Sequence, residues 1–201
     1  MTQFQQLCKS TSLARVALFS ALAMAMASAP NFAQADDEKG WIGGLFGVSA
    51  PTRSDATSRA IYGLTAGAKL GTELGIGVYY LTSPKDENVQ GQTIGNNFDF
   101  YGIEGAYHFE GEAKGAYIGA RIGITNIKIK PSNALTPAVS TTPVHWGPTV
   151  GYNYWLNRNF SLGGDVSYLL VSESSEFVGG ATATIPAFNA LNIGATAKFW
   201  F

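Results

Sequence analysis

A strict alternation of side-chain types along short segments is the feature that most constrains this chain. In the clearest segment, residues 144–156, apolar side chains such as Trp146 and Tyr154 alternate with small or polar ones such as His145 and Thr149. Successive side chains of a β-strand point to opposite faces, so a period of two indicates a strand between two different environments. Segments nearer the C-terminus repeat the pattern. The chain is therefore expected to be all-β.

Eight segments of this kind are expected as strands, each about 10 to 13 residues long and rich in glycine, aromatic and β-branched residues. Between them, no stretch is long and apolar enough for a membrane helix. The eight segments are approximately 40–49, 59–70, 74–83, 97–109, 115–128, 144–156, 160–171 and 187–201.

The connections between these segments alternate in length. Short connections at one end and long loops at the other are typical of an up-and-down outer-membrane barrel, whose turns face the periplasm. An even number of strands then places both termini on the periplasmic side. The short connections are 71–73, 110–114 and 157–159, and the long ones are 50–58, 84–96, 129–143 and 172–186.

The two faces also agree across the short turns. If Leu70 and Leu74 flank the first turn, both belong to the apolar face, and the same holds for Leu156 and Phe160 at the third turn. A shift of one residue would move every side chain to the wrong face, so this agreement supports the register.

The N-terminus has the three parts of a secretory signal peptide. Lys9 and Arg15 are the only charges before an apolar run at 16–29, and Ala33-Gln34-Ala35 supplies a small-x-small end. The run is too short to cross about 30 Å of hydrocarbon as a helix. We predict a cleavable signal peptide at residues 1–35.

The remaining part, residues 36–201, is expected to be one domain. The full chain has 13 basic and 14 acidic residues, so loss of Lys9 and Arg15 leaves 11 and 14, a net charge of −3. This weak acidity gives no reason to expect nucleic acid as a partner. Cys8 leaves with the signal peptide, so the mature part has no thiol for a disulfide, a nucleophile or a metal.

The face of the strands that carries small or polar side chains distinguishes a membrane barrel from a soluble one. In a soluble calyx this face would meet water and carry many charges. Here it consists mostly of Gly, Ser, Thr, Ala and Asn, as expected for a narrow barrel interior, and its clear charges are only Lys69, Glu104, Arg121, Asp165 and Lys198.

The apolar face begins and ends in aromatic residues, which are enriched at the two interfaces of a bilayer. These two girdles around an aliphatic belt predict a transmembrane barrel. Toward the loops lie Tyr62, Tyr80, Tyr101, Trp146 and Tyr168, and toward the turns lie Tyr107, Phe109, Tyr154, Phe160, Phe199 and Phe201.

The last strand carries the most specific resemblance. Terminal Phe201, with Ile193, Ala195, Ala197 and Phe199 at alternate positions before it, resembles the small outer-membrane β-barrel superfamily of OmpA-, OmpX- and OmpW-like, porin-like proteins of Gram-negative envelopes. The resemblance implies residence in the cell outer membrane among lipid and lipopolysaccharide. It also implies that the outer-membrane barrel assembly machinery reads these residues during biogenesis.

The inward charges are a candidate network in the lumen. A symmetric second hairpin places Glu104 opposite Arg121, with Asp165 at similar depth and Lys69 and Lys198 nearer the periplasmic mouth. Buried charges must be paired, so the network either plugs and stiffens the lumen or lines a narrow path for ions.

Two further hypotheses concern the loops and catalysis. The outward loops, with residues such as Thr52, Arg53 and Glu176, are candidate sites for host or phage surfaces. His108 and His145 are isolated, with no His-x-Ser motif of lipid A deacylase barrels, so we expect no enzyme, no metal and no cofactor.

The expected function is a structural or adhesin-like role with a side-chain-filled lumen. The alternative is a narrow porin-like channel for ions or small solutes, and an enzyme acting on lipid A or phospholipid is the least favoured hypothesis.

Overall fold

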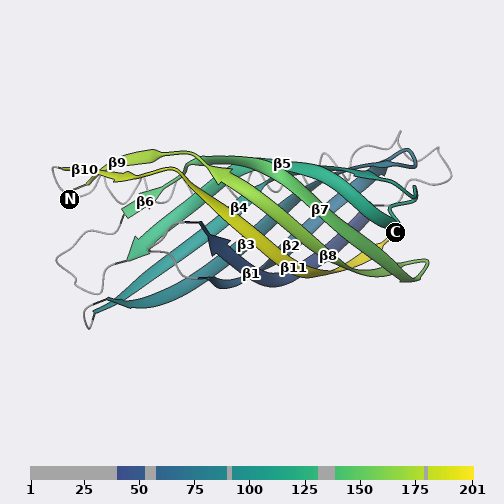
Figure 1. Ribbon diagram of the computed structural model, residues 1–201, viewed down its shortest axis with the longest axis horizontal. Coiled ribbons are helices and arrows are strands. Elements are labelled where there is room, and N and C mark those ends of the chain that lie inside the picture. The colour runs from purple at the N-terminus through teal and green to yellow at the C-terminus, as the bar shows by residue number, and fades with distance from the viewer. Residues whose placement is uncertain (1–39, 53–57, 90–91, 131–138, 179–180) are drawn as a thin grey trace, which may run out of the picture. The chain divides into compact units, whose positions relative to one another are not determined.

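A computed structural model describes most of the chain outside its N-terminal region (Figure 1). The predicted signal peptide at residues 1–35 lies outside the described residues. Within the described part, no helix has the length and hydropathy that a membrane crossing requires. The described residues are 40–52, 58–89, 92–130, 139–178 and 181–201.

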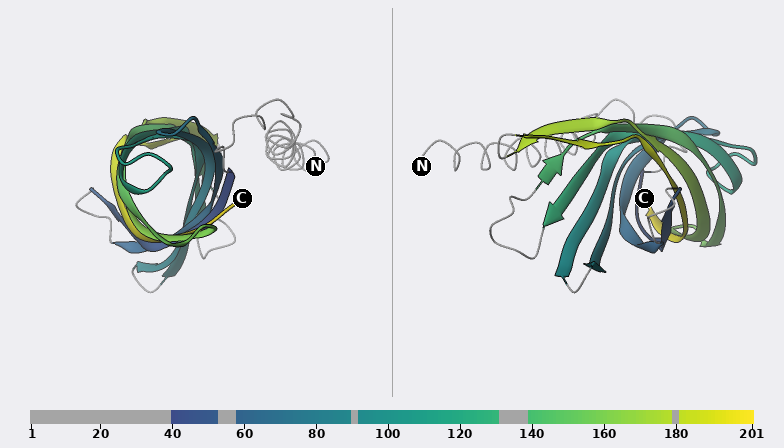
Figure 2. Two further views of the ribbon diagram at one scale, coloured as in Figure 1. Left: turned by 90° about the vertical axis from the view of Figure 1, so that its right-hand side faces the viewer. Right: turned by 60° about the vertical axis from the view of Figure 1, so that its left-hand side comes forward.

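Long antiparallel strands form one closed ring of eight (Figure 2). Each strand pairs with its neighbours along the chain, and the pairing of the first with the last closes the ring. The predicted eight-stranded up-and-down barrel is therefore confirmed. The ring consists of β1 (Gly40–Pro51), β2 (Arg59–Leu70), β3 (Leu74–Val89), β4 (Gln92–His108), β5 (Gly115–Lys130), β7 (Val144–Asn157), β8 (Phe160–Val171) and β11 (Phe188–Trp200).

The strand ends differ from the prediction at the long connections. β3 and β4 continue as a paired hairpin to Val89 and Gln92, where a loop at 84–96 was expected. The polar sequence there has no alternation to mark a strand, but the backbone ladder simply continues in register. Three short strands also lie in predicted loops: β6 (Val139–Thr141), which pairs with β5, and β9 (Ser174–Val178), which pairs with β10 (Ala181–Ile185).

The short turns and the two chain ends lie together at one end of the barrel. Gly40 and Phe201 exchange two backbone hydrogen bonds of 2.9 Å, and Trp200 N–H donates to the carbonyl of Asn159 in the third turn at 2.8 Å. We call this the turn end of the barrel and the opposite one the loop end.

The first turn has the expected register, and the third does not. Leu70 pairs with Leu74, as predicted. In the third turn Phe160 pairs with Asn157 rather than with Leu156, because a β-bulge lies between Trp155 and Asn157. The bulge absorbs one residue, and the side chain of Asn157 accepts a hydrogen bond from the Asn159 N–H at 2.9 Å across the tight turn.

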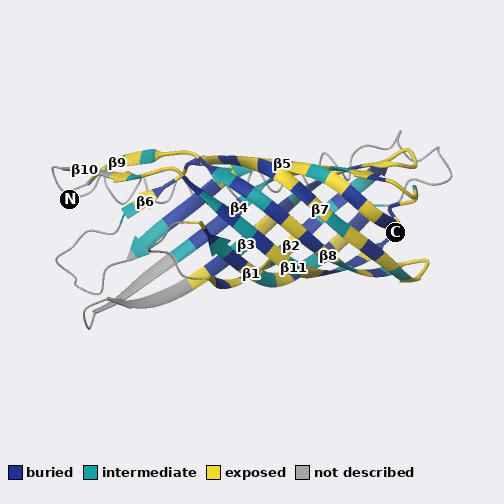
Figure 3. Cartoon of the chain, viewed as in Figure 1, coloured by how far each residue is buried: buried dark blue, intermediate teal, exposed yellow. Residues whose placement is uncertain are grey.

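Exposed and buried residues alternate along the barrel strands (Figure 3). On β7, Trp146, Val150 and Tyr154 are exposed, whereas His145 and Thr149 are buried inside the ring. The aromatic residues predicted for the two girdles lie on the outward face, all partly or fully exposed. A large apolar surface thus covers the outside of the barrel.

Glycines on the inward face make room for large aromatic side chains. A Cβ atom at Gly151 would lie 2.3 Å from Cζ of Tyr117, and one at Gly67 would lie 2.4 Å from Cζ2 of Trp41. If any other residue replaced these glycines, the side chains of Tyr117 and Trp41 could not keep their positions. These glycines therefore set how the lumen is filled.

Candidate functional site in the barrel lumen

An ion-pair network centred on Arg121 crosses the lumen near mid-height. Arg121 on β5 lies directly opposite Glu104 on β4, and its Nε donates to Oε2 of Glu104 at 3.0 Å. Its Nη1 and Nη2 donate to Oδ1 and Oδ2 of Asp165 on β8 at 2.8 and 3.1 Å. The exposed fractions of the Arg121 and Asp165 side chains are 5% and 1%. The guanidinium thus ties the partly buried carboxylate of Glu104 to the buried carboxylate of Asp165 on another part of the ring.

Hydroxyl groups complete the network. The hydroxyl of Thr65 on β2 donates to Oε1 of Glu104 at 2.6 Å. Oδ2 of Asp165 accepts hydrogen bonds from the hydroxyls of Tyr117 at 2.8 Å and Thr149 at 3.0 Å. All four carboxylate oxygens are therefore engaged, and five strands are joined across the lumen.

The two predicted lumen lysines lie on the same inward face, and both are buried. The ammonium of Lys198 lies over two aromatic rings, 5.2 Å from the centroid of Tyr117 and 5.9 Å from that of Trp41. Lys69 faces Gly75 across the β2–β3 pair, as expected from the first turn. The structure thus brings Glu104, Arg121 and Asp165 into one network and places Lys198 against aromatic rings instead.

Aromatic side chains close the turn end. The ring centroid of Trp200 lies 5.3 Å from that of Trp41 and 5.0 Å from that of Trp155. The connection between β4 and β5 folds across the mouth of the ring (Figure 2), so that Ala113 is fully buried and its carbonyl accepts hydrogen bonds from Asn153 at 3.1 Å and Trp155 at 3.3 Å. Trp41, Ala113, Trp155 and Trp200 form what we call the turn-end cluster.

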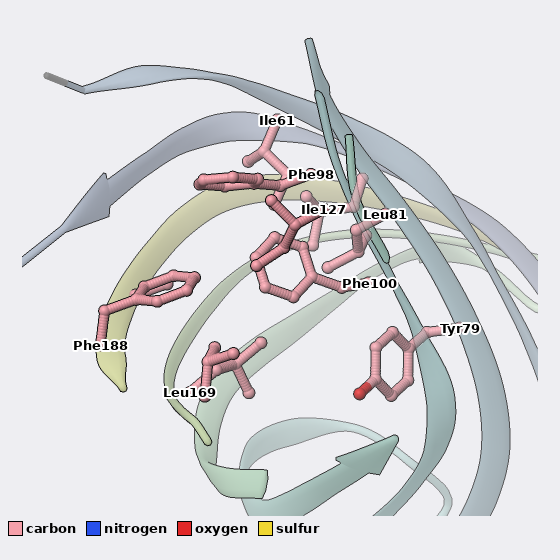
Figure 4. Packing of buried hydrophobic residues seen from close by; sticks show 11 residues of the cluster. Ile61, Tyr79, Leu81, Phe98, Phe100, Ile127, Leu169 and Phe188 are labelled. Carbon is pink, nitrogen blue, oxygen red and sulfur yellow. The ribbon is translucent and has the colours of Figure 1, made fainter. Parts of the chain in front are cut away.

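A larger apolar cluster packs inside the ring toward the loop end (Figure 4). The Phe98 ring lies 5.6 Å from that of Phe188 and 6.4 Å from that of Phe100, and the guanidinium of Arg59 lies 4.2 Å from its centroid. This loop-end cluster consists of Leu45, Ile61, Tyr79, Leu81, Phe98, Phe100, Ile127, Leu169, Val171, Phe188 and Ala190.

The two clusters correct the expectation of an inward face made mostly of small residues. That face is small or polar only along the middle of the strands, and large side chains fill it toward both ends. Along β4 the polarity of the two faces switches. Apolar Ile103 points outward, whereas closer to the loop end apolar Phe98 and Phe100 point inward and polar Asp99 points outward. Polar side chains belong outside and apolar ones inside wherever the barrel wall meets water, so the reversal marks where the wall leaves the lipid.

Asp99 is a buried carboxylate that the sequence did not single out. Its Oδ1 accepts hydrogen bonds from Thr82 at 2.8 Å, from Asn97 at 2.9 Å and from Tyr80 at 3.3 Å. Its Oδ2 accepts one from Asn126 at 3.3 Å. Such a carboxylate on the outward face belongs at or above the headgroups, because a charge facing hydrocarbon is costly. It therefore gives a second marker of the membrane boundary.

A small cavity remains between the two clusters. Its volume is about 30 Å³, room for about two water molecules. The network residues Glu104, Arg121 and Asp165 line it together with Lys198 and Trp41.

Both histidines are buried among other side chains of the lumen. His145 is fully buried, with Nδ1 2.9 Å from the Thr125 hydroxyl and Nε2 hydrogen-bonded to the Tyr79 hydroxyl. The buried ring of His108 lies 5.3 Å from that of Tyr117. In the described part of the chain, no three His, Cys, Asp or Glu residues are grouped so as to hold a metal ion.

The residues of the predicted assembly signal lie on β11, which pairs with β1 and β8, except Phe201, which directly follows the strand. Ile193 and Phe199 are exposed on the outward face, and Ala195 and Ala197 share that face. Phe201 is exposed at the turn end, where its backbone pairs with Gly40. Their role in assembly stays a prediction.

Comparison with known proteins gives the same fold. Neisserial surface protein A superposes with a TM-score of 0.57 at 11% identity, covering 82% of this chain and 97% of that one. A major outer membrane protein from Thermus thermophilus gives a TM-score of 0.53 at 14% identity, covering 82% and 99%. No curated protein matches by sequence. The family described as outer membrane protein beta-barrel domain matches residues 19–199. This protein therefore belongs to the outer membrane β-barrel domain family, and its apolar outer face is the lipid-facing surface of an outer-membrane barrel.

Proposed function

We propose that this barrel acts through its loop end as an adhesin-like surface protein, and that its lumen conducts no solutes. The observation that carries the proposal is that large side chains pack inside the ring at two levels, in the loop-end cluster and in the turn-end cluster. Eight strands enclose an interior only wide enough for side chains to fill.

The space between the clusters supports a closed lumen. Conduction of ions needs a continuous path of water or of polar groups that replace it. The cavity of about 30 Å³ holds about two water molecules. The network around Arg121 crosses the lumen beside it, and Arg121 cannot move without separating two buried ion pairs.

The loop end offers structured surface beyond the lipid. The β3–β4 hairpin continues past the level of Asp99, and β9 and β10 form a second hairpin. Phe177 on β9 is 74% exposed, and the neighbouring Glu176 accepts a hydrogen bond from the Ser140 N–H of β6 at 2.8 Å. This hairpin presents an aromatic side chain on an anchored β-structure, a suitable contact for a host or phage surface. Arg53 of the predicted loops lies outside the described residues.

The orientation belongs to the same proposal. With the turn end and both termini in the periplasm, the loop end faces outward through the lipopolysaccharide layer. The barrel assembly machinery would then read the predicted assembly signal from the periplasm, that is, Ile193, Ala195, Ala197, Phe199 and Phe201.

The test replaces residues 174–185 with a short Gly-Ser turn in cells that display the protein. Adhesion to epithelial monolayers and adsorption of a panel of tailed phages are then measured. We expect the wild type to raise at least one form of binding and the replacement to abolish that gain. Lys114→Ala, at the turn end, is the matched control and should bind as the wild type does. Full binding by the replacement variant, or no gain with the wild type, would contradict the proposal.

A further inference from the structure

The turn between β4 and β5 reaches across the mouth of the ring toward the strand pair that closes it. In the order of the ring, this turn lies opposite the β1–β11 pair, which we call the seam. Ala113 of the turn nevertheless packs in one cluster with Trp41 of β1 and Trp200 of β11, which are paired directly across the seam. Figure 2 shows the turn within the mouth of the ring. The turn thus connects one side of the turn end to the other.

Two adjacent residues of this turn hold a backbone conformation that L-amino acids avoid. The φ angles of Glu112 and Ala113 are 47° and 56°, in the left-handed region. That region is costly for residues other than glycine and persists only where the surroundings fix it. Ala113 is fully buried, and its carbonyl accepts hydrogen bonds from the side chains of Asn153 at 3.1 Å and Trp155 at 3.3 Å. Loss of these contacts would let the turn relax out of the mouth.

The cluster around Ala113 is complete only when the seam is closed. The Trp200 ring stacks on Trp155 at a centroid distance of 5.0 Å and lies 5.3 Å from Trp41. Trp41 and Trp200 lie near opposite ends of the chain, and the pairing of β1 with β11 makes them neighbours. The docked turn and the closed seam therefore stabilise each other, because both contribute to one set of contacts.

We propose that the β4–β5 turn is a latch that holds the seam closed. The turn docks once β1 and β11 have paired, and its release precedes their separation. No turn connects β1 to β11, whereas each of the other strand pairs in the ring is joined along the chain, so the seam is where the ring opens most readily. The inference is independent of the proposed surface function, since the loop end plays no part in it.

The latch should slow unfolding of the finished barrel without changing how fast it folds. Contacts that form after the transition state affect the unfolding rate and leave the folding rate unchanged. A latch that docks on a closed seam belongs to this class. Its contribution is therefore kinetic, and it is measured as an unfolding rate rather than as a yield of folded protein.

The first test measures unfolding rates in detergent micelles after a jump into urea. Trp155→Phe keeps an aromatic ring and removes the N–H that binds the Ala113 carbonyl, so unfolding should be about fivefold faster, with an unchanged folding rate. Trp146→Phe is the matched control, because Trp146 lies on the outward face of the same strand, and it should unfold at the wild-type rate.

A cross-link across the seam distinguishes a latch from a contact that merely stabilises the barrel. Ser49 on β1 and Asn192 on β11 are buried and lie directly opposite each other, and the predicted mature chain has no cysteine of its own. The double variant Ser49→Cys, Asn192→Cys is compared in its oxidised and reduced forms, in urea that unfolds both. Oxidation should cancel the effect of Trp155→Phe, and reduction should restore it. Arg121→Met acts on the lumen network instead and should speed unfolding in both forms.

A second variant keeps the test valid if Trp155→Phe loosens the packing in general. Glu112→Gly relieves the left-handed backbone at an exposed position, so it should slow unfolding, and oxidation of the seam disulfide should cancel that gain too. The exposed ion pair of Glu112 with Lys114 contributes little to this comparison. The proposal is overturned if Glu112→Gly fails to slow unfolding. It is equally overturned if Trp155→Phe speeds unfolding by the same factor in the oxidised and reduced forms.

Discussion

Replacement of Arg121 by methionine should destabilise the barrel more than any substitution at the exposed turns. Arg121→Met keeps much of the side-chain volume but removes the donors that hold Glu104 at 3.0 Å and Asp165 at 2.8 Å. Both carboxylates stay buried in the lumen, and each loses the guanidinium that compensates its charge.

The expected cost follows from leaving buried charges without that partner. Removal of one member of a buried ion pair costs about 3–5 kcal/mol, because the remaining charge is no longer compensated. Thr65, Tyr117 and Thr149 still donate to the two carboxylates, which keeps the cost within this range rather than above it. We therefore expect the free energy of unfolding to fall by about 4 kcal/mol.

The assay is urea unfolding in phospholipid vesicles, followed by tryptophan fluorescence. The triple variant Arg121→Met, Glu104→Gln, Asp165→Asn should recover most of the loss, because replacing a whole buried ionic group is often near neutral. Lys128→Met is the control, since its ammonium is half-exposed and lies 4.0 Å from Asp99, and it should change stability by less than about 1 kcal/mol. A loss below about 1 kcal/mol for Arg121→Met, or no recovery in the triple variant, would refute this reasoning.

Two further substitutions test the lumen packing and the lipid-facing surface. Gly151→Ala should cost at least about 1–3 kcal/mol in the same assay, because its Cβ would lie 2.3 Å from Tyr117, whereas Gly105→Ala should be neutral, because nothing lies within 4 Å of its Cβ. Equal effects of the two alanines would contradict this packing. Ile122→Arg, near mid-height on the outward face, should cost about 2–4 kcal/mol in vesicles, and Val144→Arg, near the loop end, about 0–1 kcal/mol. Equal costs at the two depths would show that this face does not contact lipid.

The strands and turns could be predicted because lipid imposes a strong periodic pattern. Every second residue of a strand such as β7 must be apolar to face hydrocarbon, so Trp146 and Tyr154 are readable from sequence alone. The register of the first turn follows, since a slip would turn Leu70 and Leu74 inward. The bulge beside Leu156 escaped prediction because it changes pairing without changing the composition of the segment.

The filling of the lumen could be predicted only in part. Opposed charges such as Glu104 and Arg121 stand out on a face that is otherwise small and polar, but nothing in the sequence tells that Lys198 lies against aromatic rings. Phe98 and Phe100 were missed because, where the wall leaves the lipid, apolar side chains move from the outward face to the inward face. Trp41 and Trp200 already have inward parity, so the turn-end cluster could have been found by extending the alternation to the ends of the strands.

Conductance across a planar bilayer tests the sealed barrel most directly. Recordings would compare the refolded wild type with Arg121→Ala, which weakens the charge network but leaves the loop-end and turn-end clusters in place. We expect no stepwise currents from either protein, because the clusters close the lumen without help from Arg121. Reproducible unitary currents from the wild type would contradict a closed lumen and would assign this protein to narrow channels instead.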